Sequence, residues 1–350
     1  MHIFSRLTGI AARITALLFL AASLVLGLDS ALTALIGAPI TATVTEDNPI
    51  SAPDMSGFIE EGMVIPAEEG TRAPETEPLP FEENNKEEGI RIVERDLSRG
   101  ASPGEILTSN ETPYDPDFKK LLALPYPIKV SLPAYSDAAE PLVLIIHTHG
   151  TEAFTPEGVT AAESDTAARS DDTSENIVAV GTVMTEVLRE AGIPTLHCEI
   201  MHDLESYTYS YDYSLETVLT YLEEYPSIKY IFDVHRDAIT TTAGDIAKLV
   251  CEIDGELTAQ VMTVVGTDHR GADHGGWQDN LRVAATLQDM LTRQYPGIAR
   301  PINIRSASFH QQYSPGFLLL EVGSAGNTLT EAKRAGKILA GVIADMIKAG

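Results

Sequence analysis

One run of residues, Leu142 to Glu152, constrains the fold of this chain more than any other. It reads Leu-Val-Leu-Ile-Ile-His-Thr-His-Gly-Thr-Glu, so five apolar residues lead directly into two histidines, a glycine and a carboxylate. A short, continuous apolar run is typical of a strand that is buried on both faces, as in a sheet covered by helices. Ligands and metals gather at the carboxyl ends of strands in such sheets. We therefore expect His147 and His149 to lie at a functional site.

Strand-like and helical segments alternate through residues 123–350. Asp254-Gly255 lies between two apolar runs and is a strong hairpin signal. Ser174 is the predicted N-cap of the first long helix, which puts Glu175 in its first turn. This order of elements favours an α/β fold with a single, mostly parallel or mixed sheet covered by helices. The predicted strands are 141–148, 195–200, 229–234, 247–253, 257–265, 301–305 and 317–322, and the predicted helices are 175–191, 214–225, 280–295 and 329–349.

The first 40 residues are predicted to direct the chain to a membrane. Ile14 to Leu28 carries no charge, and Leu7 to Ala12 extends it to the roughly 20 residues that a transmembrane helix needs, with Arg13 at the interface. The positive flank predicts a cytoplasmic amino end and an extracytoplasmic remainder. A cleaved signal peptide is the alternative for residues 1–40. In either case we expect the rest of the chain to act outside the cell membrane.

Residues 41–122 have the composition of a disordered, acidic, Pro-rich tether. Between Thr41 and Lys120 there are 19 Asp and Glu against 7 Lys and Arg, so this segment repels itself and has little apolar surface to bury. Ile90 to Val93 is apolar enough for a short strand. The net charge of the whole chain, −27, argues against nucleic acid as a partner, because it repels phosphate. The folded domain is predicted to begin at residue 123.

Four acidic or imidazole side chains stand at predicted strand ends or at a helix start: His149, Glu175, His235 and Glu321. A catalytic zinc ion typically has three His or carboxylate ligands and one open position for water, and the first three residues would make such a site. Glu321 follows four apolar residues, where a carboxylate is costly to bury without a partner, so it is the predicted general base. For each histidine alone, a hydrogen-bonded structural role is the alternative.

Several blocks of the sequence resemble the stage II sporulation protein P family. The resemblance covers roughly residues 142–350 and implies a membrane-anchored, Zn²⁺-dependent N-acetylmuramoyl-L-alanine amidase of peptidoglycan, with endopeptidase activity on cross-links also found in the family. It further implies the zinc amidase fold, action in engulfment during sporulation, in the intermembrane space of the sporangium, and stage II sporulation proteins D and M as partners. The matching blocks are Leu144–Glu152, Asn176–Gly181, Ser227–Ala238, Val264–Asp268, Leu320–Gly323 and Gly326–Thr328.

The resemblance also implies roles for individual residues. His149 falls on the first zinc ligand, Glu175 on the helix-start glutamate, His235 on the strand-end histidine and Glu321 on the catalytic glutamate. It selects His149 over His147, but residues two apart on a strand share a face, so both are expected near the metal.

Four further residues are predicted around these ligands. His202, Asp203 and Asp237 are candidates because metal-bound imidazoles usually donate their second N–H to a carboxylate or carbonyl. Arg236 would hold a carboxylate of the stem peptide through two hydrogen bonds, with a structural ion pair as the alternative.

Two other functions compete with the amidase. A catalytically idle, anchored scaffold or peptidoglycan-binding component of the engulfment complex would keep the fold, but it has no physical need for all four site residues. Another zinc hydrolase, such as a carboxypeptidase, would need a pocket for a terminal carboxylate, and Arg236 keeps that alternative open.

Overall fold

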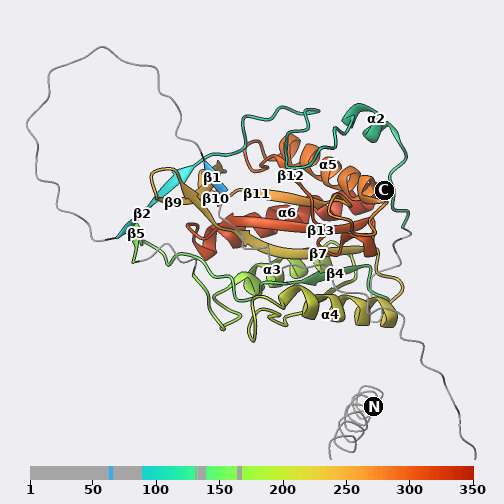
Figure 1. Ribbon diagram of the computed structural model, residues 1–350, viewed down its shortest axis with the longest axis horizontal. Coiled ribbons are helices and arrows are strands. Elements are labelled where there is room, and N and C mark those ends of the chain that lie inside the picture. The colour runs from blue at the N-terminus through green and yellow to red at the C-terminus, as the bar shows by residue number, and fades with distance from the viewer. Residues whose placement is uncertain (1–62, 66–88, 131, 133–138, 164–167) are drawn as a thin grey trace, which may run out of the picture. The chain divides into compact units, whose positions relative to one another are not determined.

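The computed structural model describes residues 63–65, 89–130, 132, 139–163 and 168–350, all within the unit Pro53–Gly350. Among these residues, seven strands form the main sheet in the order β3-β12-β11-β13-β7-β4-β6 (Figure 1). Neighbouring strands are parallel except for β11 and β13, so the predicted mixed, mostly parallel sheet is confirmed. The strands are β3 (Thr108–Asn110), β4 (Val143–Ile146), β6 (Thr195–His197), β7 (Tyr230–Asp237), β11 (Val261–Gly266), β12 (Ile302–Arg305) and β13 (Gly316–Ser324).

Helices cover both faces of the main sheet. Val143 and Ile145 of β4 pack into a core with α3 (Ile177–Glu190), α5 (Trp277–Gln294) and α6 (Leu329–Ala349). Leu144 and Ile146 point to the opposite face, where they pack with α4 (Ser210–Glu224). The apolar run of β4 is therefore continuous because each face of the strand has its own core.

The described residues also form a second sheet, so the prediction of a single sheet is wrong. Its strand order is β1-β8-β9-β2-β5, and β10 pairs with β9. The predicted hairpin is present, and Asp254 and Gly255 have the positive φ angles that its turn requires. The predicted second strand of the hairpin is interrupted at the buried Gln260. The part before Gln260, β10, pairs with β9, and the part after it, β11, pairs with β13 of the main sheet. The strands are β1 (Met63–Ile65), β2 (Ile90–Arg95), β5 (Ala161–Ala162), β8 (Ile239–Thr241), β9 (Ile246–Ile253) and β10 (Glu256–Ala259).

The folded region begins earlier than the predicted boundary at residue 123. Strand β2, predicted at 90–93, lies between β9 and β5, and β3 pairs with β12 of the main sheet. A short helix, α2 (Phe118–Ala123), follows. The predicted anchor, residues 1–40, and most of the predicted tether lie outside the described residues. In the described part of the chain, no helix is long and apolar enough to span a membrane.

Helix α3 begins two residues later than predicted. Its N-cap is Asn176, whose Oδ1 accepts a hydrogen bond from the backbone N–H of Val178 at 2.9 Å. The Asn176 side chain is buried and donates to the carbonyl of Ser170, whereas Ser174 is exposed and donates to Asp172. Glu175 therefore precedes the helix and is not in its first turn.

The Asn176 cap gives a test of this helix start. We expect Asn176→Ala to lower the free energy of unfolding by about 1–2 kcal/mol, because one helix N–H and one loop carbonyl lose their partner. Ser174→Ala is the matched control and should change it by less than about 0.5 kcal/mol. Chemical denaturation of both variants measures the difference, and a larger loss for Ser174→Ala would contradict the assignment of the cap.

Candidate functional site

The centre of the site is a pair of buried histidines, His149 and His235. Tyr230, Phe232 and Val234 of β7 face the core with α3, α5 and α6, so His235 faces the α4 side of the sheet. His149 lies in the turn that follows β4, and its ring meets the His235 ring edge-on at 5.3 Å between centroids.

Three carboxylates surround His235. Asp233 Oδ1 lies 3.0 Å from its Nε2, Glu152 Oε2 lies 3.6 Å from its Nδ1, and Glu321 is its direct neighbour in the parallel β7–β13 pairing. Burial acts to lower the pKa of His235, but the negative charges of Asp233, Glu152 and Glu321 raise that pKa to about 10. In the metal-free protein, His235 is therefore charged at neutral pH.

Asp233 is a site residue that the sequence analysis missed. It is buried, and it accepts hydrogen bonds from the Thr148 backbone N–H at 2.8 Å and the Thr148 hydroxyl at 2.6 Å. Its signal in the sequence is a carboxylate inside the apolar run of β7, where a buried charge needs a partner. Asp233 thus connects the turn that carries His149 to the strand that carries His235.

His149 is enclosed by aromatic rings. Tyr207 stacks on its imidazole at 4.4 Å between centroids, and Tyr211 meets it edge-on at 5.6 Å. Nδ1 of His149 lies 3.9 Å from Asp203 Oδ2 and has no hydrogen-bond partner among the described residues. Burial, assisted by the charge on His235, lowers the pKa of His149 well below its usual value. His149 is therefore neutral, as a metal ligand must be.

The carboxylate next to the histidines comes from Glu152, not from Glu175. Glu152 is buried three residues after His149, and its Oε2 accepts the backbone N–H of Arg236 at 3.0 Å. Glu175 is exposed, and its side chain contacts Ser170 at 3.5 Å; no contact among the described residues joins it to either histidine. The sequence signal for Glu152 was its place in the same His-Gly-Thr-Glu run.

The donor set at this site suits a zinc ion. No three His, Cys, Asp or Glu side chains of the described residues are already grouped around a metal position. Nδ1 of His149 is nevertheless buried without a hydrogen bond within that part of the chain, which is rare for a polar atom, and Nδ1 of His235 lies beside Glu152. Two imidazoles and the Glu152 carboxylate are ligands that zinc prefers. The residues present therefore fit zinc by their chemistry.

The structure gives three of the predicted surrounding residues structural contacts. His147 lies on the α3 side of β4, with its Nδ1 2.8 Å from the Val234 carbonyl and its Nε2 2.9 Å from the His197 ring. The prediction that His147 and His149 share a face is wrong, because the chain leaves β4 at Ile146 and turns. His202 bonds to the His147 carbonyl and to Thr217, and Asp237 pairs with Arg300 at 2.7 Å.

Arg236 holds together the two ends of a loop, at Ala153 and Ala168. Its Nε donates to the Ala153 carbonyl and its Nη2 to the Ala168 carbonyl, both at 2.8 Å, and the Ala153 N–H donates to Ala168 as well. The Arg236 side chain is 1% exposed. The structure therefore favours the structural alternative for Arg236 over contact with a substrate carboxylate.

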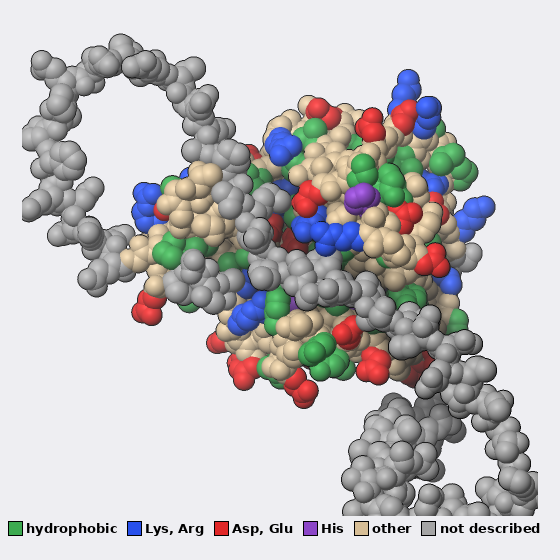
Figure 2. Space-filling model, viewed as in Figure 1, with side chains coloured by type: hydrophobic (Ala, Val, Ile, Leu, Met, Phe, Trp, Pro, Cys, Tyr) green, Lys and Arg blue, Asp and Glu red, His purple; other side chains and the backbone are tan. Residues whose placement is uncertain are grey.

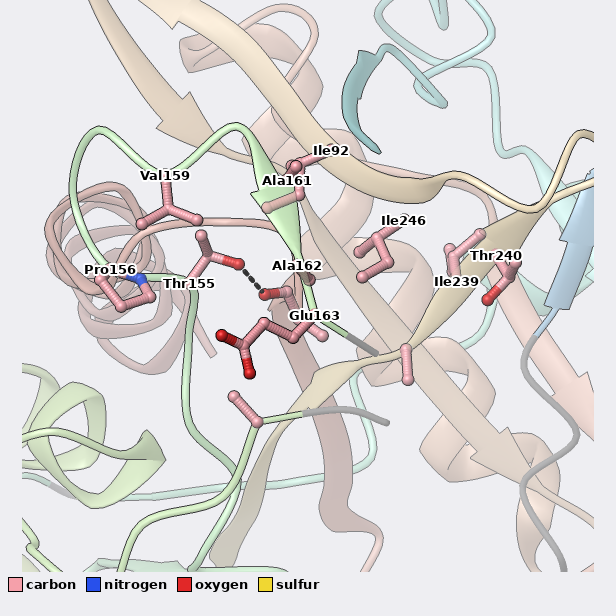
Figure 3. Close-up of a pocket in the computed structure, with 13 residues that line it drawn as sticks. Ile92, Thr155, Pro156, Val159, Ala161, Ala162, Glu163, Ile239, Thr240 and Ile246 are labelled. Atoms are coloured by element: carbon pink, nitrogen blue, oxygen red, sulfur yellow. Dashed lines mark hydrogen bonds between the residues drawn. The ribbon is translucent and has the colours of Figure 1, made fainter. Parts of the chain in front are cut away.

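This loop also lines part of a pocket of about 400 Å³ (Figure 3). Pro156 and Val159 of the loop line it on one side, and Ile239 and Ile246 of the second sheet on the other. Ala238 and Ala325, which directly follow β7 and β13, also line it. The pocket therefore begins where the strands that carry His235 and Glu321 end.

Residues 54–344 of the chain match the stage II sporulation protein P family. The chain belongs to this family. Stage II sporulation protein P of Bacillus subtilis (strain 168) is 28% identical over 228 residues, which are 61% of this chain and 53% of that protein. The chain thus spans about half the length of this curated relative. The family expected from the sequence blocks is confirmed.

Two solved structures are similar to this chain at a low level. N-acetylmuramoyl-L-alanine amidase AmiC2 of Nostoc punctiforme is 12% identical with a TM-score of 0.35, covering 60% of this chain and 97% of that one. The CwlD amidase from Clostridioides difficile, solved in complex with the GerS lipoprotein, is 12% identical with a TM-score of 0.38, covering 61% of this chain and 100% of that one.

The charge on His235 predicts a pH dependence for the metal-free protein. Its folded-state pKa of about 10 lies above the ordinary 6.5, so its stabilising effect is complete below about pH 6.5 and is lost as the pH rises toward 10. We expect the melting temperature, measured by calorimetry with a chelator present, to fall between about pH 7 and pH 10. His235→Gln should lack this fall, and equal slopes in both proteins would refute the assignment.

Proposed function

We propose that this chain is a zinc-dependent peptidoglycan hydrolase that cleaves the amide between N-acetylmuramic acid and L-alanine of the stem peptide. The observation that carries the proposal is the buried His149–His235 pair, with Glu152 beside one ring and Glu321 in register next to it. Membership of the stage II sporulation protein P family supports it.

In this proposal, His149, His235 and Glu152 hold the zinc ion. Bound zinc supplies Lewis acidity, which acidifies water and polarises a carbonyl. Glu321 accepts the proton of the attacking water and returns it to the leaving amine, because it is buried beside His235 at the same level of the sheet. Asp233, fixed by Thr148, orients the His235 ring and balances its charge.

We further propose where the enzyme works. The charge-free run near the amino end supports a membrane anchor, with the folded unit on the extracytoplasmic side. Family membership supports a role in engulfment during sporulation, beside stage II sporulation proteins D and M. Cleavage of peptide cross-links is a second activity that the same ligand set would support.

The third ligand is tested by a matched pair of variants. We expect Glu152→Gln to weaken zinc binding at least about tenfold, because a buried carboxylate next to His235 is lost. Glu175→Gln, the same change on an exposed side chain, should leave the zinc affinity unchanged. Competition with a chelating dye measures both affinities on the full chain. Weaker zinc binding by Glu175→Gln, with unchanged binding by Glu152→Gln, would instead indicate Glu175 as the ligand.

The role of Glu321 is tested on purified peptidoglycan. We expect Glu321→Gln to keep one zinc per chain and to release stem peptides about 100-fold more slowly or worse, because the proton carrier is removed. Mass spectrometry of the products should show peptides with a free L-alanine amino group. Zinc without release by the parent chain would instead favour the scaffold function, and new amines only at cross-links would favour the endopeptidase.

A further inference from the structure

We infer that Arg169 binds a carboxylate on the peptide part of the substrate, close to the amide that is cleaved. This inference rests on the proposed function and adds to it a residue that recognises the peptide. Three observations carry it: where the Arg169 side chain emerges, how its guanidinium is held, and which of its N–H groups remain available.

Arg169 emerges next to the metal ligands. It faces Glu152 in an antiparallel bridge, and directly opposed residues of such a bridge project to the same side. Its Nη1 donates to Asp203 Oδ2 at 2.6 Å and to the Thr151 hydroxyl at 2.9 Å. Asp203 is itself buried and accepts the Thr151 backbone N–H and hydroxyl. One end of the guanidinium is therefore fixed to the turn that carries His149 and Glu152.

Contacts through Tyr207 and Asp203 hold Arg169 near His149. The guanidinium of Arg169 lies over the Tyr207 ring at 4.8 Å, and Tyr207 stacks on His149 at 4.4 Å. Asp203 Oδ2 lies 2.6 Å from Nη1 of Arg169 and 3.9 Å from Nδ1 of His149, so these two nitrogens are at most about 6.5 Å apart. Peptide residues advance about 3.3–3.6 Å each, so a carboxylate two residues from the cleaved bond lies roughly 7 Å away along the chain. Arg169 is therefore at a suitable distance from the site to bind such a carboxylate.

The remaining edge of the guanidinium is available for a ligand. Nε and Nη2 have no hydrogen bond or ion pair with any described residue, and the side chain is 38% exposed. These two N–H groups are parallel and match the two oxygens of a carboxylate. Arg236, in contrast, is buried, and its N–H groups donate to the carbonyls of Ala153 and Ala168. Arg169 is thus the arginine of this pair that can reach a ligand.

The acidic charge of the protein favours a local cation at a site that binds an anionic peptide. The chain carries a net charge of −27, and acidic side chains are scattered over the face in Figure 2. An anionic peptide is repelled by this surface unless a positioned cation compensates locally. In the stem peptide, the residue after L-alanine carries the carboxylate nearest to the proposed cleavage point. The ligand of Arg169 is therefore the carboxylate of that second residue.

The competing role for Arg169 is a structural ion pair with Asp203, so the test must separate the two. The full chain with Glu321→Gln, which blocks turnover, is titrated with two synthetic muramoyl dipeptides that differ only in this carboxylate, free or amidated. We expect the free acid to bind about ten- to a hundredfold more tightly than the amide, as for a charge-assisted pair. Adding Arg169→Gln should abolish this preference, and Arg169→Lys should retain part of it.

Arg305→Gln is the matched control. Its side chain is 36% exposed and pairs with Glu111 at 3.1 Å, but it lies on β12, at the other side of the main sheet from β4. This variant should keep the full preference for the free acid. Zinc content and melting temperature of each variant verify that Arg169→Gln has not lost the site through unfolding.

Two outcomes overturn the inference: a preference that survives Arg169→Gln, or equal or absent binding of the two dipeptides by the parent. Release of peptides from peptidoglycan by the chain with native Glu321 is measured alongside. Release without a carboxylate preference rejects only the role of Arg169. A carboxylate preference that disappears with Arg169→Gln, without any release, rejects the hydrolase and leaves the binding residue in place.

Discussion

The site depends on one electrostatic constraint, which is that three carboxylates converge on a single buried imidazole. Asp233, Glu152 and Glu321 all act on His235, and like charges this close cannot remain ionised in a buried space without a cation. In the metal-free protein, a proton on His235 supplies that positive charge. A divalent ion bound there would supply positive charge in place of the proton.

The second sheet supports the site from a distance. Arg236 holds together the two ends of the loop that follows Glu152. This loop contains β5, which pairs with β2. Strand β2 in turn pairs with β9. The segment upstream of residue 123 therefore stabilises the loop that holds Glu152 and Arg169, although it contributes no predicted site residue.

The sequence was sufficient where the signal is local and insufficient where it depends on distant contacts. The apolar runs predicted β4, β7 and β13, and the polar residues at their ends predicted His149, His235 and Glu321 as neighbours, which the structure brings together. Glu175 was misplaced because Ser174 and Asn176 are both good N-caps, and the choice between them depends on burial. The length of β2 was underestimated because its backbone pairs with β9 and β5, and this pairing requires no more than its three apolar side chains.

The two arginines show the same limit of prediction from sequence. Arg236 follows His235 directly, so the sequence left both a substrate contact and a structural ion pair open, and alternation along β7 turns its side chain away from the α4 face. Arg169 lies in a polar loop without periodicity, and only its bridge to Glu152 and its contact with Asp203 bring it to the site. A strand fixes the direction of its side chains from sequence, whereas a loop obtains it from the residues that it contacts. The proposed catalytic groups are therefore more predictable here than the proposed substrate-binding group.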